Sequence, residues 1–73
     1  MIALVWLSAP QSNGNGWVSR CGTFAIRECL YLNSDVREYW CYYRPAPDHK
    51  FMHIPDGVMP SFLEAVALCQ NRP

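Results

Sequence analysis

The chain has 73 residues and no net charge, because six basic side chains balance six acidic ones. Its length predicts one domain, residues 1–73, near the lower limit at which a single hydrophobic core holds a fold. The hydrophobic content of 51% excludes a disordered chain, and the balanced charge argues against binding driven by phosphate contacts. Three Trp, four Tyr and three Phe residues exceed what so small a core buries, so we expect some of them at an interface.

The N-terminal apolar run, residues 2–8, predicts a first strand that is buried on both faces. No basic residue precedes it. The only small residues at which a signal peptide could be cleaved are directly followed by Pro10, which disfavours cleavage, so the run does not read as a signal peptide. The run is also too short to span a bilayer. We therefore expect a cytoplasmic protein without a membrane partner, whose cysteines at positions 21, 29, 41 and 69 are reduced, buried thiols.

Two further extended runs predict a β-hairpin. A stretch of turn formers, residues 10–16 (PQSNGNG), separates them from the first strand. Residues 22–32 predict a second strand, and residues 36–44 predict a third that is rich in aromatic residues of high β-propensity. Only the turn residues 33–35 join these two runs, so we expect the runs to pair as an antiparallel hairpin.

The C-terminal third of the chain predicts a loop followed by one helix. Pro45 and Pro47 end the third strand, and the loop after them contains a short extended piece at 51–54. Ser61 and Glu64 form a capping box, and apolar residues follow at helical spacing. The predicted fold class is therefore α+β: a three- to four-stranded antiparallel sheet with one C-terminal helix packed on one face.

The aromatic strand (EYWCYYRP in its sequence) presents different side chains to its two faces. Side chains alternate along a strand, so Tyr39, Cys41 and Tyr43 share one face. Cysteine is small and commonly buried, and a small residue lets a helix approach a sheet closely. We therefore expect Cys41 under the helix, near Cys69 or Val66.

The opposite face of this strand is the candidate binding surface. One helix covers only one face of a sheet, so the other face meets solvent, the N-terminal segment or another molecule. Trp, Tyr and Arg dominate interface hot spots. The predicted partner-binding residues are the rings of this face and the arginines around them: Trp40, Tyr42, Arg44, Arg27 and Arg37. The alternative is that the rings form a second small core under the Trp6 or Trp17 segment, with the arginines at its edge.

Residues that could carry chemistry are few. His49 and His53 suggest a metal site, but prolines flank them and no cysteine pair has the spacing of a zinc finger. A Cys–His nucleophile pair needs a thiol of lowered pKa, and Cys69 lies at the C-terminal end of the helix, which is the wrong end. We therefore expect no enzyme activity, no catalytic residue, no metal site and no cofactor.

Nucleic-acid binding is the alternative function. Residues 20–28 (RCGTFAIRE) weakly resemble the aromatic strand on which RRM domains stack bases, although the order is broken and one helix replaces two. Single-stranded nucleic acid would stack on Trp40 and Tyr42, with Arg44 and Arg27 on phosphates. The zero net charge makes this hypothesis weaker than protein binding. A homodimer that uses the same face is a third hypothesis.

A recurring order of residue types runs from Trp17 to the C-terminus. A Trp or Gly precedes an aromatic-x-Ile strand, and an aromatic strand, a Pro-containing loop and a Ser-aliphatic-Glu-x-Ala helix ending in Cys follow. The matching positions are Trp17, Gly22, Phe24, Ile26, Tyr39, Trp40, Cys41, Tyr42, Pro45, Ser61, Phe62, Leu63, Glu64, Ala65 and Cys69. This order resembles a loose class of small bacterial and prophage proteins with a sheet-plus-helix fold.

The resemblance implies a phage or mobile-element protein that is compact, non-enzymatic and binds one host machine, as anti-CRISPR inhibitors do. We therefore expect a cytoplasmic inhibitor, inside a bacterial host, that docks its aromatic and arginine face onto a host protein complex and blocks it sterically. The chain is not acidic, so docking by shape and aromatic contact is expected in place of DNA mimicry.

Overall fold

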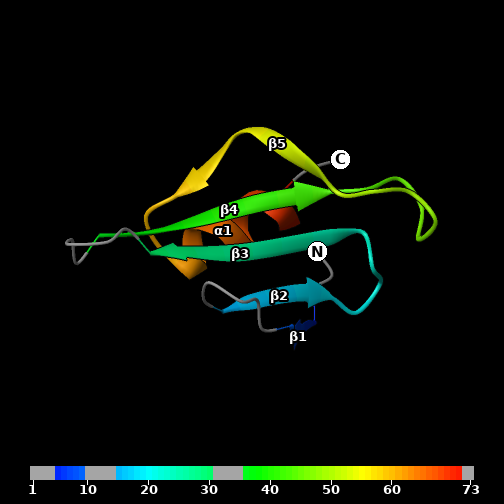
Figure 1. Cartoon of the computed structure of the whole chain (residues 1–73), viewed down its shortest axis with the longest axis horizontal. Coiled ribbons are helices and arrows are strands. Elements are labelled where there is room, and N and C mark those ends of the chain that lie inside the picture. The colour runs from blue at the N-terminus through cyan, green and yellow to red at the C-terminus, as the bar shows by residue number, and fades with distance from the viewer. Residues whose placement is uncertain (1–4, 10–14, 31–35, 72–73) are drawn as a thin grey trace.

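The computed structural model describes residues 5–9, 15–30 and 36–71, which form a five-stranded antiparallel sheet with one helix across one face (Figure 1). Each strand pairs with the next strand in the chain. The elements are β1 (Trp6–Ser8), β2 (Gly16–Ser19), β3 (Phe24–Leu30), β4 (Arg37–Tyr43), β5 (Met52–Met59) and α1 (Phe62–Gln70). The α+β class and the C-terminal helix are as predicted, and the sheet has five strands where three or four were expected.

The centre of the sheet is the predicted hairpin of β3 and β4. Its register runs without interruption from the pair Phe24–Tyr43 to the pair Leu30–Arg37. Alternating apolar and aromatic side chains favour such a ladder, because opposite side chains pack against each other on both faces. The predicted turn at 33–35 lies outside the described residues. The hairpin fixes the direction in which every side chain of the aromatic strand points.

The N-terminal half adds two short strands to one edge of this hairpin. Strand β2 was not predicted, and it pairs with β3 on one side and with β1 on the other. Strand β1 has no other described neighbour, and Leu7 within it is 51% exposed. The expectation of a first strand buried on both faces is therefore wrong for its described part, because Leu7 points to the sheet face that the helix does not cover.

Strand β5 is longer than the predicted extended piece at 51–54, and it continues through Pro55. Proline is tolerated here because β5 is an edge strand, where a missing N–H leaves no inner ladder bond unmade. The register shifts between Trp40 and Tyr42 of β4, opposite this point. Asp56 has a positive φ of 59°, and a Cβ at Gly57 would lie 2.7 Å from the carbonyl oxygen of Ile54. A bulge at 55–57 therefore carries the strand past its proline.

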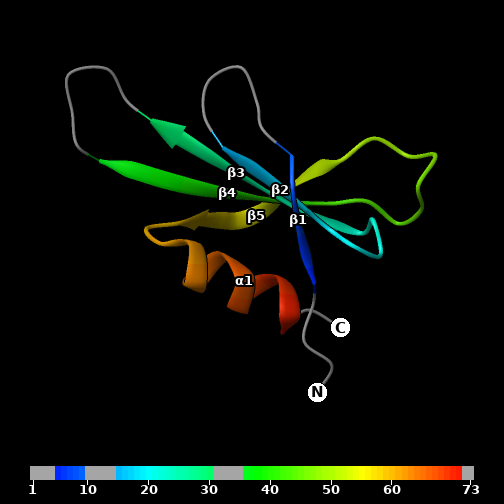
Figure 2. The ribbon, with the colours of Figure 1, turned by 90° about the horizontal axis from the view of Figure 1, so that it is seen from below.

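Helix α1 packs against β3, β4 and β5 from one side of the sheet (Figure 2). The predicted cap is present, since the Glu64 amide donates to Ser61 Oγ at 3.2 Å and the Ser61 hydroxyl donates to the Glu64 carboxylate at 3.0 Å. The buried core lies between helix and sheet and consists of Ile26, Cys41, Ile54, Ala65 and Cys69. The expected position of Cys41 under the helix is confirmed, because its thiol reaches the Ala65 carbonyl at 3.8 Å.

Candidate interaction surface

The sheet face opposite the helix carries most of the predicted binding residues. Tyr39, Cys41 and Tyr43 pack toward α1, so the residues between them point the other way. Within the described part of the chain, no helix or strand packs over that second face (Figure 2). We call it the open face and define it by six side chains: Arg27, Trp40, Tyr42, Arg44, Phe51 and His53.

Three rings of the open face form one cluster across β4 and β5. The His53 ring centroid lies 4.9 Å from that of Trp40 and 5.5 Å from that of Tyr42. Trp40 also pairs with Arg27 in register, so the cluster continues onto β3. His53 lies in the extended piece expected at 51–54, but it was considered only as a candidate metal ligand and not as part of this face. The alternation of Phe51 and His53 within an extended piece could have placed both on this face.

The indole nitrogen of Trp40 has an unusual environment. Trp40 Nε1 is buried and has no hydrogen-bond acceptor in the part of the chain that the structure describes. A buried N–H without an acceptor is unfavourable by about 1–3 kcal/mol. The indole nitrogen of Trp6, on the helix side of the sheet, is also buried without an acceptor among the described residues, so this feature describes the packing of Trp40 and does not by itself indicate binding.

Arg44 has a positioning role at one end of the open face. Its Nε donates to the Gly22 carbonyl at 2.6 Å, and its Nη1 donates to the Pro47 carbonyl at 3.2 Å. Its guanidinium carbon lies 4.3 Å from the centroid of the Phe51 ring. Arg44 therefore holds the β2–β3 turn, the loop after β4 and one ring of the surface together.

A hollow of about 230 Å³ opens beside the ring cluster. Its lining residues are Trp17, Val18, Ala25, Ile26, Arg27, Tyr42 and Phe51. Ala25 stands in register between Val18 and Tyr42, and its small side chain leaves the space. Small-molecule sites usually have volumes of roughly 300–1,000 Å³. The hollow is smaller than these and suits a single side chain of a partner.

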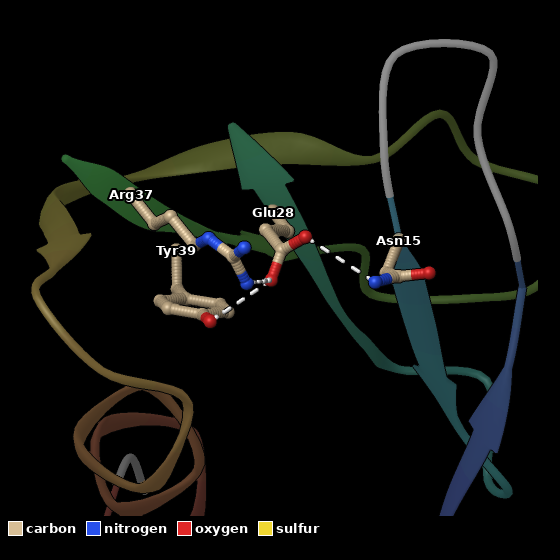
Figure 3. A network of polar contacts seen from close by, with 4 residues as sticks. All are labelled: Asn15, Glu28, Arg37 and Tyr39. Atoms are coloured by element: carbon tan, nitrogen blue, oxygen red, sulfur yellow. Dashed lines mark hydrogen bonds and ion pairs between the residues drawn. The ribbon is translucent and has the colours of Figure 1, made fainter. Parts of the chain in front are cut away.

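Arg37 is not part of the open face. It shares the orientation of Tyr39, and its Nη1 lies 3.8 Å from a carboxylate oxygen of Glu28 on the helix side of the sheet (Figure 3). The structure therefore brings together four of the five predicted binding residues and places Arg37 apart from them.

Glu28 is a buried carboxylate that was not among the residues predicted to be functional. Its side chain is only 6% exposed. Besides Arg37, it accepts hydrogen bonds from the Tyr39 hydroxyl at 2.9 Å and from the Asn15 amide at 3.2 Å (Figure 3). The bond to Glu28, together with burial, raises the pKa of Tyr39. A carboxylate with this many donors is stable in a buried position, so we assign the network a structural role.

The rings of Trp6 and Trp17 do not form a second core over the open face, although Trp17 and Val18 line the hollow at its edge. Trp17 and Trp6 lie on the helix side, with ring centroids 4.5 Å and 6.4 Å from that of Phe62. They extend the main core along the sheet, and they leave the open face uncovered.

The two histidines have separate surroundings. His49 lies in the loop after β4, where its Nε2 is 3.9 Å from a carboxylate oxygen of Asp48, whereas His53 stacks with the rings of the open face. The described residues contain no group of three His, Cys, Asp or Glu side chains that could hold a metal ion.

Cys21 differs from the predicted buried thiols because it lies exposed in the turn between β2 and β3. Ser19 is buried below it, with its Oγ 3.3 Å from the Cys21 sulfur. Hydrogen bonds from Ser19 and from the Thr23 backbone lower the pKa of the Cys21 thiol, and burial opposes them. The expectation of buried thiols therefore holds for Cys41 and Cys69, is wrong for Cys21, and is met only in part for Cys29, which is half-buried.

Comparisons with protein-family models, with curated proteins and with solved structures give no match to this chain. The described residues also include no helix with the length and apolar character needed to cross a membrane. The assignment of function therefore depends on the geometry of the chain itself.

Proposed function

We propose that the chain is a non-enzymatic binding module that docks a protein partner on its open face. The observation that carries this proposal is the ring cluster beside the hollow, in which two paired strands hold the His53 ring within 5.5 Å of both Trp40 and Tyr42. Rings fixed on a sheet lose little conformational entropy on binding, which favours affinity. Trp, Tyr and Arg are also the residue types that dominate hot spots.

The electrostatics of the open face favour a protein over a nucleic acid. Arg44 already donates to two backbone carbonyls, and the alternation of β4 places the acidic Glu38 on the same face as Arg27. The chain as a whole has no net charge. Phosphate-driven binding needs several arginines or lysines with donors available, so the surface offers little to a nucleic-acid backbone.

The finer form of the proposal is a steric inhibitor of a bacterial host complex, encoded by a phage or other mobile element. A rigid face on a chain of 73 residues fits this role, because occlusion of a site requires shape and affinity but no turnover. The hollow would receive one anchoring side chain of the target, and the rings around it would exclude water.

The experiment is a pull-down from nuclease-treated bacterial lysate, followed by measurement of the dissociation constant with the purified target. The baits are the wild-type chain, Trp40→Ala and the matched control Leu63→Ala, whose side chain is 79% exposed on the helix. We expect the wild type and Leu63→Ala to retain the target with equal affinity, and Trp40→Ala to lose it while remaining folded.

Three other outcomes would overturn the proposal. Loss of all partners after nuclease treatment would support nucleic-acid binding on the same rings. A concentration-dependent mass that Trp40→Ala abolishes would show that the face is a homodimer interface. Unfolding of Trp40→Ala would show that the ring belongs to the core.

A further inference from the structure

We propose that Cys41 and Cys69 form a dithiol that a hydroperoxide oxidises to a disulfide between β4 and α1. The two residues are far apart in the chain but meet in the core, where Cys41 is 0% exposed and Cys69 is 1% exposed. The proposal concerns covalent modification of the core and is independent of the proposed binding function.

The contacts of Cys41 with the helix define the geometry. Its thiol donates to the Ala65 carbonyl at 3.8 Å. Ala65 lies one helical turn before Cys69, so both residues face the sheet at the same place. The neighbouring Cys69 side chain lowers the pKa of the Cys41 thiol through hydrogen bonding, and burial opposes this effect.

The surroundings allow the two backbones to approach. Ala65 is the smallest side chain of the core, and the Cys41 thiol lies close enough to the helix backbone to reach the Ala65 carbonyl oxygen at 3.8 Å. Helix and sheet are thus separated by small groups at this point. A disulfide requires Cβ atoms roughly 3.5–4.5 Å apart, so oxidation would bring the Cβ atoms of Cys41 and Cys69 to that separation.

The reaction has two steps. The Cys41 thiolate attacks one oxygen of hydrogen peroxide, the O–O bond breaks, and sulfenic acid forms as hydroxide leaves. The Cys69 sulfur then attacks the Cys41 sulfur, the S–O bond breaks, and water leaves with the thiol proton. In total, two thiols and one peroxide give one disulfide and two waters, and the two sulfurs supply both electrons.

Access to the buried pair comes through the end of the helix. Cys69 is the penultimate residue of α1, and the last turn of a helix opens more easily than its middle. Oxidation should therefore be slower than reaction at the exposed Cys21. Once formed, the bond would hold the helix against the strand that carries Trp40 and Tyr42.

The test uses the full chain with Cys21→Ser and Cys29→Ser, so that only the core pair remains. After treatment of the folded protein with hydrogen peroxide, thiols are counted in denaturant and peptides are mapped by mass spectrometry. We expect two thiols to fall to none, a loss of two hydrogen atoms in mass, a Cys41–Cys69 linked peptide, and a monomer on non-reducing gels. The midpoint of thermal unfolding should rise by about 10 °C.

A matched chain with Cys41→Ala and Cys69→Ala, which keeps Cys21 and Cys29, should show no such rise. If this control is unfolded, the peptide map of the first chain still shows whether Cys41 and Cys69 are cross-linked. Retention of both thiols, addition of oxygen atoms without a cross-link, or a linked peptide that appears only when the chain is unfolded first would each overturn the proposal.

Discussion

The Nε of Arg44 donates a 2.6 Å hydrogen bond to the carbonyl oxygen of Gly22, and this bond connects the end of β4 to the turn between β2 and β3. Gly22 has a positive φ of 80°, and a Cβ there would lie 3.2 Å from Arg44 Nη2. The conformation of the turn and the position of the guanidinium therefore depend on each other.

We expect Arg44→Lys to lower the free energy of unfolding by about 1–2 kcal/mol. Lysine cannot donate to both the Gly22 and Pro47 carbonyls while it also covers the Phe51 ring. Urea unfolding monitored by tryptophan fluorescence measures the change. Arg27→Lys, on the same face, is the control and should change stability by less than about 0.5 kcal/mol. Equal effects of the two substitutions would show that Arg44 has no special positioning role.

The Glu28 network predicts a second stability difference. We expect Glu28→Ala to lower the free energy of unfolding by about 2 kcal/mol, because the Tyr39 hydroxyl and the Asn15 amide lose their acceptor. Arg37→Ala should have an effect below about 0.5 kcal/mol, since its side chain is 60% exposed and screened by solvent. Chemical denaturation of both variants measures these changes. If Glu28→Ala left the free energy of unfolding unchanged, the structural role would be contradicted.

The same network predicts a dependence of stability on alkaline pH. The Glu28 hydrogen bond raises the pKa of Tyr39 above its ordinary value of 10.0, so the folded chain favours the neutral phenol. This contribution is fully present below pH 10 and is lost as the pH rises through the higher, folded-state pKa. Tyr39→Phe should be less stable than wild type at neutral pH and should lose less stability above pH 10. Thermal unfolding in buffers of increasing alkaline pH measures this difference. If the unfolding midpoints of wild type and Tyr39→Phe fell in parallel with rising pH, the predicted contribution of Tyr39 would be excluded.

The bulge in β5 predicts opposite effects at two adjacent positions. We expect Gly57→Ala to lower the free energy of unfolding by about 1–3 kcal/mol, because the new methyl would meet the Ile54 carbonyl at 2.7 Å. Asp56→Gly should leave stability unchanged or raise it by up to about 1 kcal/mol, since glycine adopts the observed positive φ more readily. Urea titration of both variants is sufficient. A wild-type stability for Gly57→Ala would rule out the close approach of β5 to the core.

Binding through the open face predicts a weak dependence on salt. With the purified target, the dissociation constant should change less than about tenfold between 50 and 200 mM salt, whereas six to ten phosphate contacts would change it by roughly 10³–10⁵. Trp40→Phe removes the unsatisfied indole donor and keeps a ring, so it should retain the wild-type fold and weaken binding less than Trp40→Ala. A steep loss of affinity with salt would instead indicate binding to phosphates.

The elements that the sequence predicted well have strong local signals. The hairpin follows from two long runs of β-forming residues, and helix α1 follows from the Ser61–Glu64 cap and an apolar stripe. The position of Cys41 under the helix followed from strand alternation alone. These features depend on neighbours in the chain, which a sequence shows directly.

The features that were missed depend on tertiary partners. Strand β2 has four residues, too few for a period to emerge, and it is stabilised by pairing on both sides. The expected extended piece ended at residue 54, but an edge position and a bulge let β5 continue through Pro55. Glu28 occupies a core position as a charged residue because Tyr39 and Asn15 meet it there. Alternation would have placed Arg37 with Tyr39, but it was grouped with the binding residues by its position next to them in the chain.

The strand order, in which each strand pairs with its neighbour in the chain, also has consequences for the folding rate. Successive hairpins close short loops, so the entropy lost before each new ladder forms stays small. Relative contact order is therefore low for an antiparallel sheet, and we infer folding in the faster part of the range for such proteins. Docking of α1 onto β3 and onto the rings of Trp6 and Trp17 joins parts of the core that are far apart in the chain. Because the hairpins close through local contacts and the helix docks through long-range ones, we infer that the helix becomes fixed after the sheet that carries the open face has formed.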